Sequence, residues 1–182
     1  MITSKDIKMI LFNKFTMKNR HVVDNIFLGR FEADFLYVTK SGFINEVEIK
    51  VTKEDFYKDF EKGFWRSKAH GFEYAKNRIK RPKVGAFDLI KKHDLLKSGE
   101  FGWKGFYFAM PEVLADEVEI PDYCGLITIP EQELPYKYFH GSIWTPKKAP
   151  TLPKALKITP EREAQIAEAI KWRYLNDRMK GK

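Results

Sequence analysis

FEADFLYVTKSGFINEVEIK, residues 31–50, is the stretch that decides the fold. Apolar, aromatic and β-branched residues recur with period two on both sides of "KSG", which predicts two strands, 34–39 and 43–51. A three-residue loop with glycine last is typical of a type I turn closed by a bulge, in which Gly42 supplies the positive φ. The stretch therefore predicts a β-hairpin whose register is set by its own turn.

That register brings two carboxylates and a lysine together. Thr39 faces Phe43, and counting outward in equal steps places Asp34 opposite Glu48. Because side chains alternate along a strand, Glu48 and Lys50 share a face. Facing carboxylates repel each other, and a bound Mg²⁺ would turn this repulsion into attraction. Two interpretations stay open: a metal site, or a half-buried strand in which Lys50 neutralises Glu48.

The composition points to a polyanionic partner. The chain has 182 residues, enough for one domain, and Lys plus Arg outnumber Asp plus Glu by 33 to 25, giving a net charge of +8. Its single cysteine, Cys124, excludes an internal disulfide and a cysteine-rich zinc cluster. The first residues are too charged for a signal peptide, and no apolar run is long enough to span a membrane. We expect a cytoplasmic protein that does not contact a membrane.

Helices and strands are predicted around the hairpin. Helices begin after N-caps at Thr3 or Ser4, at Thr52 and at Thr159, and the second ends at Gly63. Two further strands cover 105–110 and 124–129. The order predicts an α/β fold, a mixed sheet flanked by helices. We assign residues 1–140 to one domain and 141–182 to a basic Pro-rich arm and C-terminal helix packed on it.

Asp34 followed by the strand "EVEIK" resembles the core of the PD-(D/E)xK nuclease superfamily. More narrowly, "ADFLYVTKSGFINEVEIKVTKEDFYKDF", with "FYFAMPEVLA" and "DYCGLITI" downstream, is similar to the MmcB-like branch, which is linked to DNA repair and also encoded by phages. The resemblance covers about residues 30–130. It implies a restriction-endonuclease-like core and a nuclease that uses Mg²⁺ (or Mn²⁺) to cleave DNA.

The resemblance also implies roles for individual residues. Carried over by position, Asp34 and Glu48 are the metal ligands, the Ile49 carbonyl is a further ligand, and Lys50 is the catalytic lysine. Many members carry a glutamate on the first helix, where this chain has only Asp6. Four residues are candidates for accessory roles, with plain solvation as the alternative for the last three: Glu32, Glu46, Asp59 and Lys62.

Cations gathered after the second helix and in the arm predict a surface that contacts phosphates. They are Lys76, Arg78, Lys80, Arg81, Lys83, Lys91, Lys92, Lys147 and Lys148. A solvated loop is the alternative. The four histidines are scattered and predict no metal or nuclease site. Three functions remain: a DNA nuclease of repair or phage DNA metabolism in a bacterial or phage-infected cell, a non-catalytic DNA-binding protein on the same fold, or a phage protein that intercepts a host factor. The oligomeric state stays open.

Overall fold

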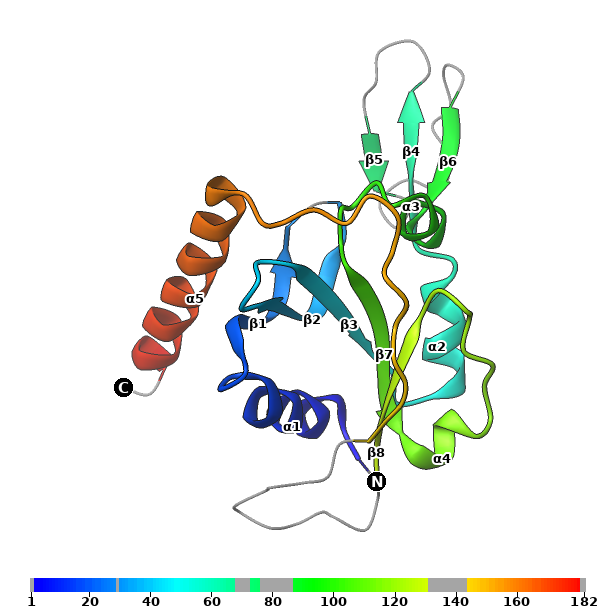
Figure 1. The fold of residues 1–182 in the computed structure, drawn as a ribbon, viewed down its shortest axis with the longest axis horizontal. Coiled ribbons are helices and arrows are strands. Elements are labelled where there is room, and N and C mark those ends of the chain that lie inside the picture. The colour runs from blue at the N-terminus through cyan, green and yellow to red at the C-terminus, as the bar shows by residue number, and fades with distance from the viewer. Residues whose placement is uncertain (1, 29, 68–72, 76–86, 131–143, 181–182) are drawn as a thin grey trace.

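The chain folds around a six-stranded mixed sheet flanked by helices, which confirms the predicted α/β class (Figure 1). The structure is a computed structural model and describes residues 2–28, 30–67, 73–75, 87–130 and 144–180. A second, three-stranded sheet projects at the top of Figure 1, in the order β5-β4-β6. Its strands are β4 (Gly63–Ser67), β5 (Glu73–Ala75) and β6 (Phe87–Lys91).

The main sheet joins an antiparallel half to a parallel half. The first three strands pair antiparallel, the next two run parallel to the third, and the last is antiparallel again. In spatial order they are β1 (Asn19–Phe27), β2 (Glu32–Thr39), β3 (Ile44–Ile49), β7 (Gly105–Pro111), β8 (Gly125–Ile129) and β9 (Trp144–Lys147). Parallel neighbours need a crossover, and the long excursion between β3 and β7 supplies one.

Helices cover both faces of this sheet. Helix α1 (Ser4–Phe15) packs Ile7 and Leu11 against Phe35 and Val47 on one face. The opposite face carries α2, α3, α4 and the start of α5. Their bounds are Lys53–Asp59, Lys92–Ser98, Glu112–Ala115 and Pro160–Lys180. In the part of the chain that the structure describes, no helix is both long and apolar enough to cross a bilayer.

The opposite face buries large aromatic side chains. Phe56 of α2 and Leu96 of α3 pack against Leu36 of β2 and Phe108 of β7. The rings of Phe56 and Phe108 meet edge to face with centroids 4.9 Å apart. Alternation along β3 therefore sends every second residue of that strand into a helix-covered core, and no face of β3 lies in water.

The predicted hairpin register is confirmed. Thr39 donates its N–H to the Phe43 carbonyl at 2.9 Å, and Gly42, with φ of +86°, donates to the Thr39 carbonyl at 2.9 Å. The ladder pairs Phe35 with Val47, in the predicted phase. The turn alone therefore fixed which residues of the two strands meet.

The predicted helix starts are confirmed, and one predicted helix end is wrong. Thr52 accepts a hydrogen bond from the Asp55 N–H at 3.1 Å, which begins α2. The helix ends at Asp59, and Gly63 opens β4 instead of terminating the helix. A Cβ at Gly63 would lie 2.8 Å from the Ile90 carbonyl oxygen on β6, so glycine serves close strand pairing there.

Residues 144–180 pack along the body of the domain. Leu152 is buried and donates its N–H to the Lys104 carbonyl, and Ile158 donates to the Gly42 carbonyl. Ile166 of α5 is fully buried in the core shared with α2 and α3. Beyond that residue α5 runs along β1, a strand that the sequence pattern does not predict.

Candidate functional site

Asp34 and Glu48 lie where β2 and β3 meet at one edge of the ladder. One step outward from the Phe35–Val47 pair places Asp34 opposite Glu48. Asp34 Oδ2 accepts the backbone N–H of Ile49 at 3.0 Å, which holds the carboxylate against β3. Burial, and then the neighbouring Glu48 carboxylate, raise the pKa of Asp34 to about 6. The structure thus brings the two predicted ligands together, at the price of mutual repulsion.

Glu48 is fully buried and surrounded by three ammonium groups. Its Oε2 accepts from Lys62 Nζ at 2.7 Å and from Lys50 Nζ at 3.1 Å. Its Oε1 accepts from Lys92 Nζ at 2.5 Å. Burial alone would raise the pKa of Glu48, but these cations, Lys92 foremost, outweigh it and hold that pKa at about 2.

Asp59 closes the cluster from the end of α2. Its Oδ1 accepts from Lys50 Nζ at 2.9 Å and lies 2.6 Å from Lys62 Nζ, and its Oδ2 lies 2.8 Å from His93 Nε2. Burial opposes ionisation, but the His93 hydrogen bond and the lysines outweigh it, so the pKa of Asp59 lies below its ordinary value. Of the accessory candidates, Asp59 is therefore a buried member of the site, and Lys62 reaches it from solvent.

Glu46 belongs to the same buried cluster. Its Oε2 accepts the indole N–H of Trp103 at 2.6 Å, and its Oε1 lies 2.6 Å from Lys92 Nζ in an ion pair. Burial, which Lys92 only partly offsets, raises the pKa of Glu46. The solvated alternative considered for Glu46 is wrong, because Glu46 is buried against Trp103 and against Lys92 of α3. We call the set Glu46, Glu48, Asp59, Lys50, Lys62 and Lys92 the carboxylate–lysine network.

His93, for which the sequence predicts no role, extends this network to a loop. His93 Nδ1 lies 2.8 Å from the Tyr123 hydroxyl, while its Nε2 faces Asp59. Because ionised Asp59 can only accept, Nε2 of His93 is the donor in that contact. The ring also stacks on Phe60 with centroids 4.3 Å apart. No local pattern in "IKKHD" signals these partners.

One predicted phosphate contact is wrong. Lys92 is fully buried, and its ammonium group is used by Glu46 and Glu48, so it cannot reach a ligand at the surface. Lys91 and Lys148 are exposed, as the prediction requires. Lys147 is half-buried and donates to two backbone carbonyls, those of Ile120 and Pro121. The remaining five candidates, Lys76, Arg78, Lys80, Arg81 and Lys83, lie outside the described residues.

The carboxylate oxygens of Asp34 and Glu48 can hold one Mg²⁺ ion, provided that Lys62 moves away from Glu48. Within the described residues, no group of three or more His, Cys, Asp or Glu side chains is arranged to hold a metal ion. Asp34 and Glu48 nevertheless supply the one or two carboxylates that Mg²⁺ takes while keeping several waters, and a cation would relieve their repulsion. Lys62 occupies Glu48 Oε2 and would have to leave. Its side chain is 36% exposed, against 3% for Lys50 and 0% for Lys92. Glu32 is exposed and stays outside the cluster.

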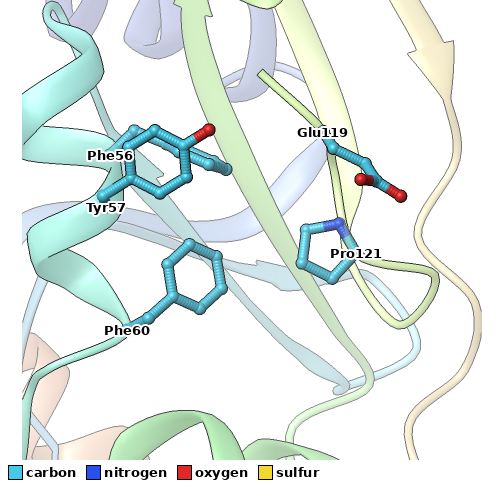
Figure 2. A pocket seen from close by; sticks show the side chains of 5 residues that line it. All are labelled: Phe56, Tyr57, Phe60, Glu119 and Pro121. Carbon is cyan, nitrogen blue, oxygen red and sulfur yellow. The ribbon is translucent and has the colours of Figure 1, made fainter.

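A shallow pocket of about 480 Å³ lies at the end of α2, next to the network (Figure 2). Phe56, Tyr57 and Phe60 line one side, and Glu119 and Pro121 line the other. Figure 2 shows the rings of Phe60 and Pro121 toward one another across the opening, with the Glu119 carboxylate turned away from them. The pocket is therefore largely apolar, and its lining residue Phe60 directly follows Asp59.

Comparison with known proteins identifies the fold alone. No family model matches this chain, and no curated protein matches it in sequence. A solved structure described as "SPO1766 protein of unknown function from Silicibacter pomeroyi" is similar, with a TM-score of 0.51 and 15% sequence identity. The match covers 86% of this chain and 78% of that chain. At such low identity it supports a shared α/β architecture and carries no function.

Proposed function

We propose that this protein is a metal-dependent nuclease that hydrolyses phosphodiester bonds, with DNA as its substrate. One observation carries the proposal: Asp34, Glu48 and Lys50 meet at the carboxyl end of β3, and Glu48 and Lys50 are almost completely buried there. Buried, strongly perturbed ionisable groups gathered in one place are typical of functional sites. The net charge of +8 suits a polyanionic substrate.

In this proposal the carboxylates would bind the metal, and the lysine would stabilise negative charge. Asp34 and Glu48 would hold the metal, with the Ile49 carbonyl as a further ligand. Bound Mg²⁺ supplies a Lewis acid for the phosphate and a lowered pKa for an attacking water. Burial alone would lower the pKa of Lys50, but Glu48 and Asp59 outweigh it and raise that pKa above its ordinary value. Lys50 therefore stays positively charged and acts as an electrostatic stabiliser, not as a general base.

A second candidate is a DNA-binding protein that does not cleave. The observation in its favour is that Glu48 already has three ammonium partners and Asp59 has two, so both carboxylates are neutralised by the chain itself. Such a site would stabilise the fold and present a positive rim without needing a metal.

A cleavage assay separates the two candidates. Duplex, single-stranded and branched DNA are incubated with the protein in Mg²⁺, in Mn²⁺ or in EDTA. Asp34→Asn removes the charge but keeps an acceptor for the Ile49 N–H, and Glu32→Gln is its control, an exposed carboxylate on the same strand. We expect metal-dependent cleavage by the wild type and Glu32→Gln and none by Asp34→Asn. Folded wild-type protein that binds DNA without cleaving it would support the second candidate.

A further inference from the structure

Lys62 duplicates the contacts of Lys50. Both ammonium groups lie on the same two oxygens, Glu48 Oε2 and Asp59 Oδ1, at 2.7 and 2.6 Å for Lys62 and 3.1 and 2.9 Å for Lys50. If Lys62 left, Glu48 would keep two lysines, and Asp59 would keep Lys50 and His93. Neither buried carboxylate would be left unpaired, and two neighbouring positive charges would separate. Lys62 is thus the member of the network that can move to an anion outside.

The pocket at the end of α2 is connected to Lys62 through the chain. Phe60 forms one of its walls and precedes Lys62 by two residues. The back of the Phe60 ring is supported by His93, stacked at 4.3 Å. The opposite wall is held by Lys147, whose Nζ donates to the Ile120 and Pro121 carbonyls at 3.0 and 2.8 Å. Each wall therefore has a supporting contact within the protein itself.

An unpaired nucleotide has the chemistry that fits this pair of features. Tyr57 lines the pocket and is 51% exposed, so an aromatic surface is open to a planar ring (Figure 2). Aromatic side chains stack on any nucleobase, whereas a base inside a duplex is already stacked and paired. The phosphate attached to that base would be drawn to the Lys62 ammonium group, since phosphate neutralisation dominates nucleic-acid affinity.

We propose that Lys62 and the Tyr57–Phe60–Pro121 pocket together bind one unpaired nucleotide of a DNA strand. The Lys62 side chain moves so that its ammonium group leaves Glu48 and Asp59 and pairs with the phosphate. The base stacks in the pocket. The inference rests on the proposed function and adds its substrate class: single-stranded DNA, or duplex with unpaired bases. It also gives Lys62 two exclusive positions, on the carboxylates without substrate and on the phosphate with it.

Fluorescence anisotropy in EDTA tests this without cleavage. The full chain is titrated with a labelled single-stranded oligonucleotide and with a blunt duplex of equal length over a series of salt concentrations. The variants are Tyr57→Ala and Lys62→Met. Their controls are Tyr174→Ala, an exposed tyrosine on α5, and Lys58→Met, an exposed lysine on α2.

We expect the wild type to prefer the single strand. Tyr57→Ala should weaken single-strand binding about tenfold and leave duplex binding within about twofold. Lys62→Met should reduce the slope of log K against log salt by about 0.7, the contribution of one phosphate contact on a single strand. Both controls should match the wild type.

Three other results would contradict the nucleotide site, its substrate class or the proposed function. If both Tyr57→Ala and Lys62→Met match their controls, the nucleotide site is wrong while the nuclease proposal stands on its own assay. Equal wild-type affinity for single strand and duplex overturns the substrate class. A wild-type protein that binds neither DNA overturns the nucleotide site together with the proposed function.

Discussion

Asp34 accepts a hydrogen bond from the backbone N–H of Ile49 at 3.0 Å, just beyond the last ladder pair between β2 and β3. A side chain thus continues the strand pairing where the backbone ladder stops. The bond holds the Asp34 carboxylate near Glu48, whose charge it would otherwise avoid. Burial and the Glu48 charge raise the pKa of the carboxyl held there, so the ionisation of Asp34 reports on the site.

Asp34→Asn should stabilise the metal-free protein at neutral pH. The pKa of Asp34 is about 6 in the fold, raised from 3.8, so between these values the native state binds more protons than the unfolded state. Wild-type stability therefore falls as the pH rises through this window, by up to about 3 kcal/mol. Urea unfolding at a series of pH values should show the variant more stable above about pH 6, with the gain vanishing below about pH 4.

Glu32→Gln serves as the control for that comparison, because Glu32 is an exposed carboxylate of the same strand. Its difference from the wild type should stay within about 0.5 kcal/mol at every pH. An Asp34→Asn protein that is less stable than the wild type at pH 8 would show that Asp34 ionisation supports the fold.

Mn²⁺ should raise the melting temperature of the wild type in proportion to the logarithm of its concentration. A ligand that binds only the native state stabilises it by mass action, and Asp34 with Glu48 supplies the hard oxygen donors. Asp34→Asn should show no such rise. A thermal melt with Mn²⁺ from zero to a large excess checks both, and a wild type that does not respond would exclude the metal site.

Lys92→Met should destabilise the protein far more than Lys62→Met. Lys92 is fully buried between Glu46 and Glu48, and removing one partner of a buried ion pair costs about 3–5 kcal/mol. Lys62 reaches solvent, and Lys50 covers the same oxygens, so its loss should cost less than about 1 kcal/mol. Urea unfolding of the two variants at pH 7 measures the difference. Equal losses would mean that Lys62 is as structural as Lys92.

Lys50→Met should abolish cleavage without abolishing DNA binding, if the protein is the proposed nuclease. Methionine keeps most of the apolar stem, and in the DNA-free variant Lys62 still neutralises Glu48 and Asp59. The lost group is the buried charge that would face the reacting phosphate, for which a drop of at least about 100-fold is expected. Single-turnover cleavage and anisotropy on the same preparation check the two effects. Unaltered cleavage would remove Lys50 from the catalytic residues.

Short-range chemistry was sufficient to predict the hairpin and the helix starts. The "KSG" loop closes on Thr39 and Phe43 with contacts that span four residues, so the register of Asp34 and Glu48 follows from the turn alone. Likewise, Thr52 caps α2 through the N–H three residues on. Such interactions depend on neighbours in the chain, which is why the pattern of residue types reveals them.

The missed elements are those whose pattern depends on distant neighbours. Strand β1, "NRHVVDNIF", buries residues irregularly, because α1 and α5 cover parts of its surface, and so no period of two marks it. The sequence predicts Gly63 as a helix terminator, because glycine often ends helices. Its actual role, close approach to the Ile90 carbonyl, exists only once β6 has paired with β4.

The partners of the buried charges were decided by the tertiary structure. Lys92 bonds to Glu48, from which it is separated by 44 positions in the sequence. The separation is 34 positions for His93 and Asp59, and 57 for Trp103 and Glu46. A lysine or a glutamate in a sequence is expected at the surface, because burying either charge alone is too unfavourable. Here α2, the residues that follow it, and α3 bring charged partners to the same face of β3. The mutual attraction of these charges, with hydrogen bonds to the remaining oxygens, offsets the loss of water.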